Sequence, residues 1–167
     1  INDGSAISND RLYRNKGDGT FEDVTISAGI VYEGFGLGLA VADLNFDGWP
    51  DLHISNDYLT NDILYINNQD GTFTNDVASY LKHQSKFSMG SDISDYDNDG
   101  FLDILTLDML GETNHRMKTN IGSTNYVEYT LNERYNYQYQ YMRNMLHKGN
   151  GSAGNYSEIG LMAGISK

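Results

Sequence analysis

The sequence predicts an all-β fold in which short antiparallel strands recur in a repeated unit. Eighteen glycines stand against a single proline in 167 residues, a balance typical of many tight turns between short strands. Asn15 and Asn67 open matching Gly-Thr-Phe turns, Asp43 and Asp95 open matching acidic loops, and both pairs are 52 residues apart. A fixed period of this kind indicates a repeat architecture.

The repeated unit begins with a hairpin. The segments Asn15-Lys-Gly-Asp-Gly-Thr-Phe21 and Asn67-Asn-Gln-Asp-Gly-Thr-Phe73 each place an Asp-Gly pair between two short strand-like stretches. Asp-Gly is a strong signal for a tight β-turn. A third copy is expected around the Asn150-Gly151 pair.

Two apolar strands follow the hairpin. Gly36–Ala42, Leu52–Ser55 and, in the second copy, Phe101–Leu107 are short apolar runs typical of strands. The Gly34-Phe-Gly-Leu-Gly38 segment is expected to let neighbouring strands approach closely. It also resembles part of a dinucleotide-binding fingerprint, but no helix follows it, so phosphate binding is disfavoured.

An acidic loop joins these two strands in each copy. Oxygen-bearing side chains stand at its positions 1, 3, 5 and 9, and a glycine stands at position 6. Calcium takes about six to eight oxygen ligands, among which a position-7 backbone carbonyl is common, and magnesium fits such a loop less well. The predicted ligands are Asp43, Asn45, Asp47, Trp49 and Asp51 in one loop, and Asp95, Asp97, Asp99, Phe101 and Asp103 in the other. The sequence therefore predicts two calcium ions.

The helix-flanked EF-hand is the obvious alternative for these loops. It shares the opening of the motif but requires a bidentate glutamate at position 12. That position holds Ile54 in the first loop and Thr106 in the second. The EF-hand is therefore excluded.

Residues 112–140 lie outside the repeat pattern. The Asp70-Gly71 and Asn150-Gly151 turns are 80 residues apart instead of 52, so about 28 residues are inserted. Ser123-Thr-Asn125 followed by Glu128 is a capping pattern that predicts a short helix, and a loop is expected before it.

Four tyrosines follow the expected helix at strand spacing. They alternate with asparagine and glutamine, which predicts one face made of Tyr135, Tyr137, Tyr139 and Tyr141. This face is expected either to pack beneath the helix or to form a flat surface for a sugar or protein, and packing is favoured.

The acidic loops and the strands before them resemble those of the FG-GAP/VCBS repeat family, integrin-type β-propellers whose calcium loops lie between blade strands. The resemblance rests on residues Gly34–Gly48 and Leu12–Phe21. The segments 141–146 and 156–160 are similar to bacterial members that carry these repeats ahead of an ASPIC/UnbV-type region.

The resemblance implies one partial β-propeller domain over residues 1–167. Its units are expected at about 9–60, 61–110 and 141–167, with a small, mostly helical or loop insertion at 112–140. Both ends are expected to interrupt a repeat, so the remaining repeats of a larger propeller, or self-association, should complete the fold.

Composition excludes several classes of function. The net charge of -12 argues against nucleic acid, whose binding requires clustered lysine and arginine. The chain has no cysteine for disulfides or thiolate metal sites, and His53, His83, His115 and His147 lack zinc-site spacing. No transmembrane segment is expected. The resemblance implies an extracellular, cell-surface or periplasmic location, with the export signal outside this chain.

The resemblance thus implies a calcium-binding propeller module for adhesion or ligand binding, with an unknown protein or glycan partner. The alternative is part of a propeller enzyme acting on polysaccharide or another polyanion, with calcium polarising the substrate. No catalytic constellation is visible in the sequence, so an enzyme is disfavoured. The second loop has four carboxylates and the first has three, so the second is expected to bind calcium more tightly.

Overall fold

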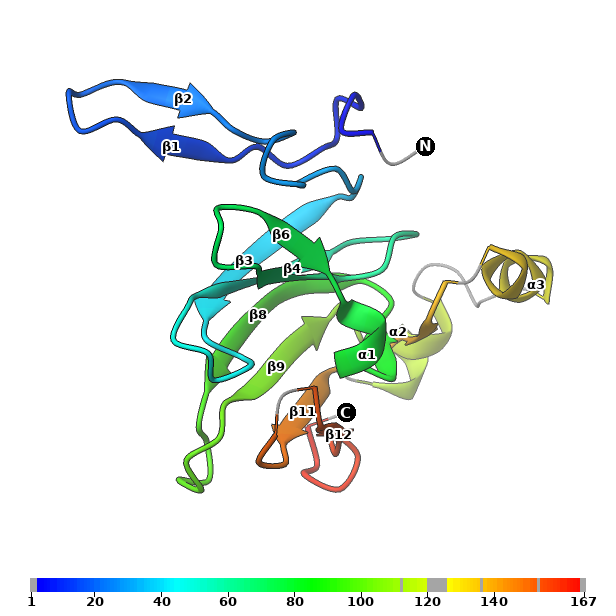
Figure 1. Cartoon of the computed structure of the whole chain (residues 1–167). Helices are drawn as coiled ribbons and strands as arrows, with labels where there is room; N and C mark the ends of the chain where they lie inside the picture. Colours follow the sequence, from blue (N-terminus) through cyan, green and yellow to red (C-terminus); the bar gives the residue numbers. More distant parts are fainter. Residues whose placement is uncertain (1–2, 112, 120–125, 136, 153, 166–167) are drawn as a thin grey trace.

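Most of the chain is antiparallel β-sheet, as the sequence predicts (Figure 1). The computed structural model describes residues 3–111, 113–119, 126–135, 137–152 and 154–165. Two four-stranded sheets, called the first and second blade below, form its centre. The first blade has the order β3 (Gly36–Ala42), β4 (Asp51–Asn56), β5 (Ile63–Asn67), β6 (Phe73–Asn75). The second has the order β8 (Ser88–Ser94), β9 (Asp103–Asp108), β11 (Met145–Gly149), β12 (Tyr156–Glu158).

Each blade combines two strands of one sequence repeat with the hairpin of the next. In the first blade, β3 and β4 come from the unit around the loop at 43–51, while β5 and β6 come from the hairpin around Asn67. The hairpin β1 (Tyr13–Asn15) and β2 (Phe21–Asp23) forms a separate two-stranded sheet. All three expected hairpins are therefore present.

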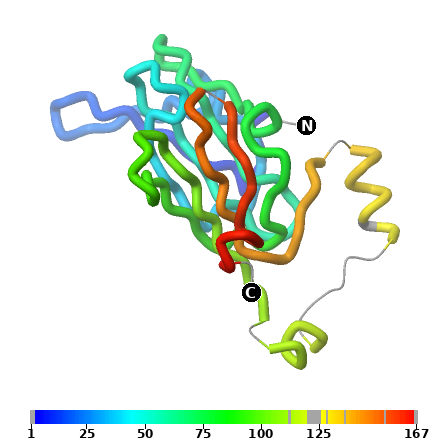
Figure 2. Tube along the Cα trace, turned by 90° about the horizontal axis from the view of Figure 1, so that it is seen from below, coloured from blue at the N-terminus to red at the C-terminus, as the bar shows by residue number. Residues whose placement is uncertain are grey.

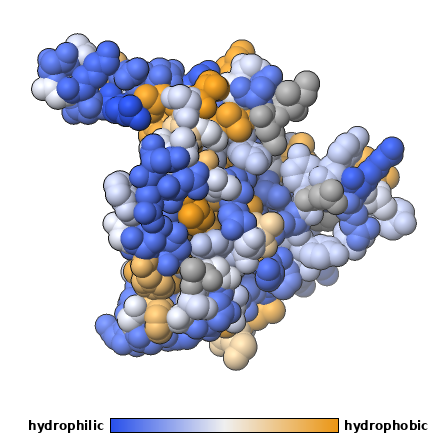
Figure 3. Space-filling view, viewed as in Figure 1, coloured by the Kyte–Doolittle hydropathy of each residue, from blue (hydrophilic) through white to orange (hydrophobic). Residues whose placement is uncertain are grey.

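Apolar side chains fill the spaces on both sides of the first blade. One cluster joins its face to the segment after β2 and contains Val24, Ala28, Ile30, Ile54, Ile63 and Tyr65. The other lies toward the second blade and contains Leu44, Leu64, Val77, Tyr80, Leu81 and Ile104. The short helix α1 (Val77–Tyr80) contributes to the second cluster. In Figure 3, hydrophobic side chains gather between the β1–β2 hairpin and the first blade.

The strands β3 and β8 lie side by side, each at the edge of its own blade (Figure 1). A Cβ atom added to Gly38 would lie 2.9 Å from the Cα atom of Gly90, closer than real Cβ atoms approach. The expected close approach of strands at this glycine-rich segment is therefore confirmed.

The insertion lies between β9 and β11, and its helices stand off from the blades (Figure 2). It contains α2 (Asn114–Thr119), α3 (Tyr126–Arg134) and β10 (Tyr139–Tyr141). Part of the segment expected as a loop before the helix forms α2 instead. The Thr113 hydroxyl accepts a hydrogen bond from Arg116 N at 3.2 Å and caps this helix. The expected short helix is α3, while its proposed capping residues 123–125 lie outside the described residues.

The tyrosine strand is shorter than expected and pairs in parallel with β7 (His83–Ser85), an exception to the antiparallel pattern. Its polar residues face the protein, since Gln138 Nε2 donates to Leu81 O at 2.8 Å and Gln140 Nε2 to Thr60 O at 3.0 Å. The favoured packing of the tyrosine face is wrong. The exposed fractions are 67% for Tyr135, 40% for Tyr137, 52% for Tyr139 and 44% for Tyr141.

None of the described helices is both long and apolar enough to span a membrane.

Candidate metal centre

The two acidic loops have the same backbone conformation. Loop 43–51 joins β3 to β4, and loop 95–103 joins β8 to β9. Position 4 has a φ of 61° in both loops, at Phe46 and Asn98, and position 6 has a φ of 89° at Gly48 and 90° at Gly100. Glycine tolerates this left-handed region best, which explains the residue at position 6.

The first aspartate closes each loop by accepting backbone hydrogen bonds. Asp43 accepts from Asp47 N at 3.1 Å and from Gly48 N at 2.8 Å. Asp95 does the same toward positions 5 and 6 of its loop, at 3.1 and 2.9 Å. These hydrogen bonds within the protein are therefore enough to close each tight turn.

The aspartate at position 9 is buried in both loops and anchors the loop to the blade. Asp51 is 0% exposed and accepts from Leu44 N at 2.9 Å and Asn67 N at 2.8 Å. Asp103 is 2% exposed and accepts from position 2 of its loop at 3.0 Å and from Gly149 N at 2.9 Å. Both oxygens of each carboxylate thus have backbone partners, one in the loop and one at the end of the third strand of the blade.

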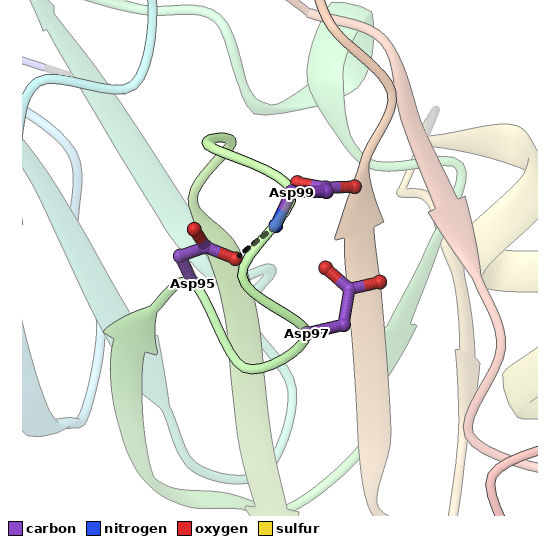
Figure 4. Close-up of side chains that lie close together, drawn as sticks. All are labelled: Asp95, Asp97 and Asp99. Carbon is purple, nitrogen blue, oxygen red and sulfur yellow. Dashed lines mark hydrogen bonds between the residues drawn. The ribbon is translucent and has the colours of Figure 1, made fainter.

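Three of the ten predicted ligands come together as a possible metal-binding group. One carboxylate oxygen from each of Asp95, Asp97 and Asp99 lies within 4.8 Å of the others. Figure 4 shows these side chains on one turn of the loop, with the bond from Asp99 N to Asp95. Such a set of charged oxygens suits a hard cation such as calcium.

A lysine that sequence reasoning missed already places a cation on this triad. Lys148 Nζ donates to Asp99 Oδ2 at 2.8 Å and also bonds to Asp97. These bonds raise the pKa of Lys148, the one to Asp97 most, and the bond from Lys148 is the main reason why the pKa of Asp99 is lowered. A positive group therefore stands beside the oxygens that an ion would use.

The signal for Lys148 is present in the sequence but displaced by the insertion. Gly149 N and Asn67 N make equivalent bonds to the position-9 aspartates, so Lys148 in β11 corresponds to Ile66 in β5. A lysine in place of isoleucine beside an acidic loop is the clue. Matching Lys148 to Ile66 requires knowing that β11 pairs with β9 across residues 109–144.

In the first loop, amide groups and not an ammonium bond to the position-5 aspartate. Asp47 Oδ2 accepts from Asn45 Nδ2 at 2.9 Å and from Gln69 Nε2 at 3.1 Å. The bond from Gln69 is the largest reason why the pKa of Asp47 is lowered. Sequence reasoning missed Gln69 because it belongs to the next hairpin.

The two loops contact each other through aromatic rings. Phe46 of the first loop and Phe101 of the second pack edge to face, with ring centroids 5.7 Å apart and an interplanar angle of 83°. Both loops therefore lie at the same end of the two blades.

Comparison with known proteins agrees with this arrangement. The FG-GAP-like repeat matches residues 2–54 and again residues 43–106. The chain is 38% identical over 101 residues to cartilage acidic protein 1 of Xenopus tropicalis. That match covers 56% of this chain and 15% of the relative, so the chain spans a small part of the relative's length.

Proposed function

Because the chain belongs to the FG-GAP-like repeat family, we propose that it is a calcium-binding module for adhesion or ligand binding in an extracellular or cell-surface protein. FG-GAP repeats are those of integrin-like binding modules, and the relative is named as an acidic protein of cartilage. The present chain is acidic as well, with a net charge of -12.

The observation that carries the calcium proposal is the convergence of Asp95, Asp97 and Asp99 around one point, with the ammonium of Lys148 beside it. Calcium would bind to these carboxylates and displace the lysine, because a divalent ion balances more of their charge. Bound calcium would supply a fixed cross-link between parts of the loop. The conformation of the loop would then depend on the ion.

A second ion is proposed in loop 43–51, where Asp43, Asn45, Asp47 and Asp51 would be ligands, together with the Trp49 carbonyl. The support is the shared backbone, including the matching φ values at positions 4 and 6. Here the ion would replace neutral amide donors instead of an ammonium.

Terbium luminescence tests the two sites separately. Terbium replaces calcium at oxygen sites, and Trp49 is the single tryptophan of the chain and lies in the first loop. Excitation of tryptophan should therefore sensitise terbium in the first loop, and calcium should compete it away. Asp47→Ala should abolish this signal, whereas Asp99→Ala should leave it and remove a binding step seen by calorimetry.

Asp18→Ala is the matched control, since Asp18 is an exposed turn aspartate that accepts a bond from Thr20 N outside both loops. It should change neither signal. Extracellular calcium modules bind at about 10⁻⁴ to 10⁻³ M, and chelation should lower the melting temperature by a few degrees. Absence of binding at millimolar calcium would contradict the proposal.

A further inference from the structure

The insertion contains a tyrosine-lined cavity that is separate from the metal loops. It has a volume of about 280 Å³ and lies between α3 and β10. Its lining includes four tyrosines and one carboxylate, namely Tyr129, Tyr137, Tyr139, Tyr141 and Glu133. A concave site with convergent aromatic rings and few charges is typical of small-ligand binding.

The amides in this cavity are largely committed to the protein. Gln138 Nε2 donates to Leu81 O at 2.8 Å, and its Oε1 accepts a bond from Gln84. Gln140 Nε2 donates to Thr60 O at 3.0 Å. Two of the three amide side chains that line the cavity thus already bond to the protein. These bonds leave fewer amide partners for a neutral sugar.

The charge of the cavity is negative. Glu133 accepts a bond from the Tyr129 hydroxyl at 2.8 Å, and this carboxylate is the main reason why the pKa of Tyr129 rises to about 12. Among the described residues, no lysine, arginine or histidine lines the cavity. Lys82 lines an adjoining cavity of about 460 Å³, and its ammonium bonds to the carbonyls of Ala78 and Ser79.

One ring of the cavity already faces a cation. The guanidinium of Arg143 lies 5.5 Å from the centroid of Tyr141, and its charge is balanced by Glu158 at 2.6 Å. Aromatic faces carry partial negative charge and attract cations, and a cage of several rings is the usual way to bind an alkylated ammonium group.

We propose that this cavity binds an alkylated ammonium group, such as a trimethylammonium ligand, between the tyrosine rings and Glu133. The rings would contact the methyl groups, and the carboxylate would balance the charge. This site requires no calcium and does not rest on the metal-binding proposal.

Calorimetric titration of the whole chain with choline chloride tests the proposal, with sodium chloride as the ionic-strength control. The decisive comparison is 3,3-dimethylbutan-1-ol, which has the same shape and no charge. Choline should bind in the millimolar range or better, and the neutral analogue about tenfold more weakly, because several partly exposed rings would each add a modest cation–π attraction.

Two variants and a matched control locate the binding. Tyr139→Leu and Glu133→Gln should each weaken choline binding about three- to tenfold. Tyr135→Leu should not change it, because Tyr135 is exposed and outside the cavity. Melting curves should show that all three variants remain folded, and Tyr137→Leu replaces either cavity variant that does not, because Tyr137 also lines the cavity.

Equal binding of choline and the neutral alcohol would overturn the proposal, because the site would then be merely apolar. Tighter binding of a disaccharide such as cellobiose would overturn it in favour of a sugar site. Absence of choline binding at tens of millimolar, or an equal loss in Tyr135→Leu, would overturn it as well.

Discussion

Loops 43–51 and 95–103 have the same backbone but differ in what balances their carboxylates. The amides of Asn45 and Gln69 bond to Asp47 in the first loop. The ammonium of Lys148 bonds to the triad in the second. Counting Lys148, the second loop has the same net charge as the first. The tighter calcium binding expected from carboxylates alone therefore depends on how readily the lysine leaves.

The buried position-9 aspartates that both loops share should give the largest effect on the free energy of unfolding. Asp51→Ala and Asp103→Ala each remove a buried carboxylate that accepts two backbone hydrogen bonds. Bonds to charged groups contribute about 1.5 to 3 kcal/mol each, so each variant should lose about 3 kcal/mol or more of unfolding free energy. Urea denaturation in chelator measures this loss.

The two losses should agree within about 1 kcal/mol, because the anchors are equivalent. Asp18→Ala, an exposed turn aspartate, should cost less than about 1 kcal/mol. A small loss in one anchor variant and a large loss in the other would show that the two loops do not share a scaffold in solution.

Lys148, which bonds to the second loop alone, should give the second largest effect, on the calcium affinity of that loop. Lys148→Ile places in the second blade the residue type that β5 carries at Ile66. Without the competing ammonium, calcium affinity of the second loop should rise about tenfold, as expected for removing one charge near a divalent ion in a solvated site. Calorimetry on the Asp47→Ala background isolates that binding step.

Lys16→Ile is the control for Lys148→Ile, since Lys16 lies in the exposed turn between β1 and β2. It should leave the calcium affinity unchanged. An unchanged affinity in Lys148→Ile would mean that the lysine moves away at no cost, and the two loops should then differ by their carboxylate count alone.

Local chemistry explains what the sequence could predict about this protein. The Asp-Gly turns specify the hairpins, and the loop motif specifies both its turn and the strands beside it. The triad of Asp95, Asp97 and Asp99 lies within five residues, so its convergence follows from one turn. The Thr113 cap of α2 was also local, and it was missed because the segment has little apolar periodicity.

Contacts between distant segments explain what could not be predicted. Lys148 is 51 residues from Asp97 and reaches it only because β11 pairs with β9 across the insertion. The parallel pairing of β10 with β7 is equally remote. The alternation in residues 135–141 predicts two faces but not which one is outward. Tyrosine suits either side, and the glutamines turn inward because carbonyls of the 60–61 and 81 segments accept their amides.

The contact between the loops gives the smallest expected effect, through the edge-to-face pair of Phe46 and Phe101. Such pairs contribute about 0.5 to 1.5 kcal/mol, so a double-mutant cycle of Phe46→Ala and Phe101→Ala should show a coupling of this size. Calcium bound in one loop would fix the ring of that loop against the ring of the other. Filling the first loop should therefore raise the calcium affinity of the second about two- to fivefold, as that coupling energy allows. Phe46→Ala should remove this dependence while leaving the affinity of the second loop, measured alone on the Asp47→Ala background, nearly unchanged.

Phe35→Ala is the control, because Phe35 is exposed and outside both loops, and its cycle with Phe101→Ala should be additive. Additivity in the Phe46 cycle as well would mean that the two loops bind independently, and that their likeness is one of descent from a common repeat and not of a shared response to calcium.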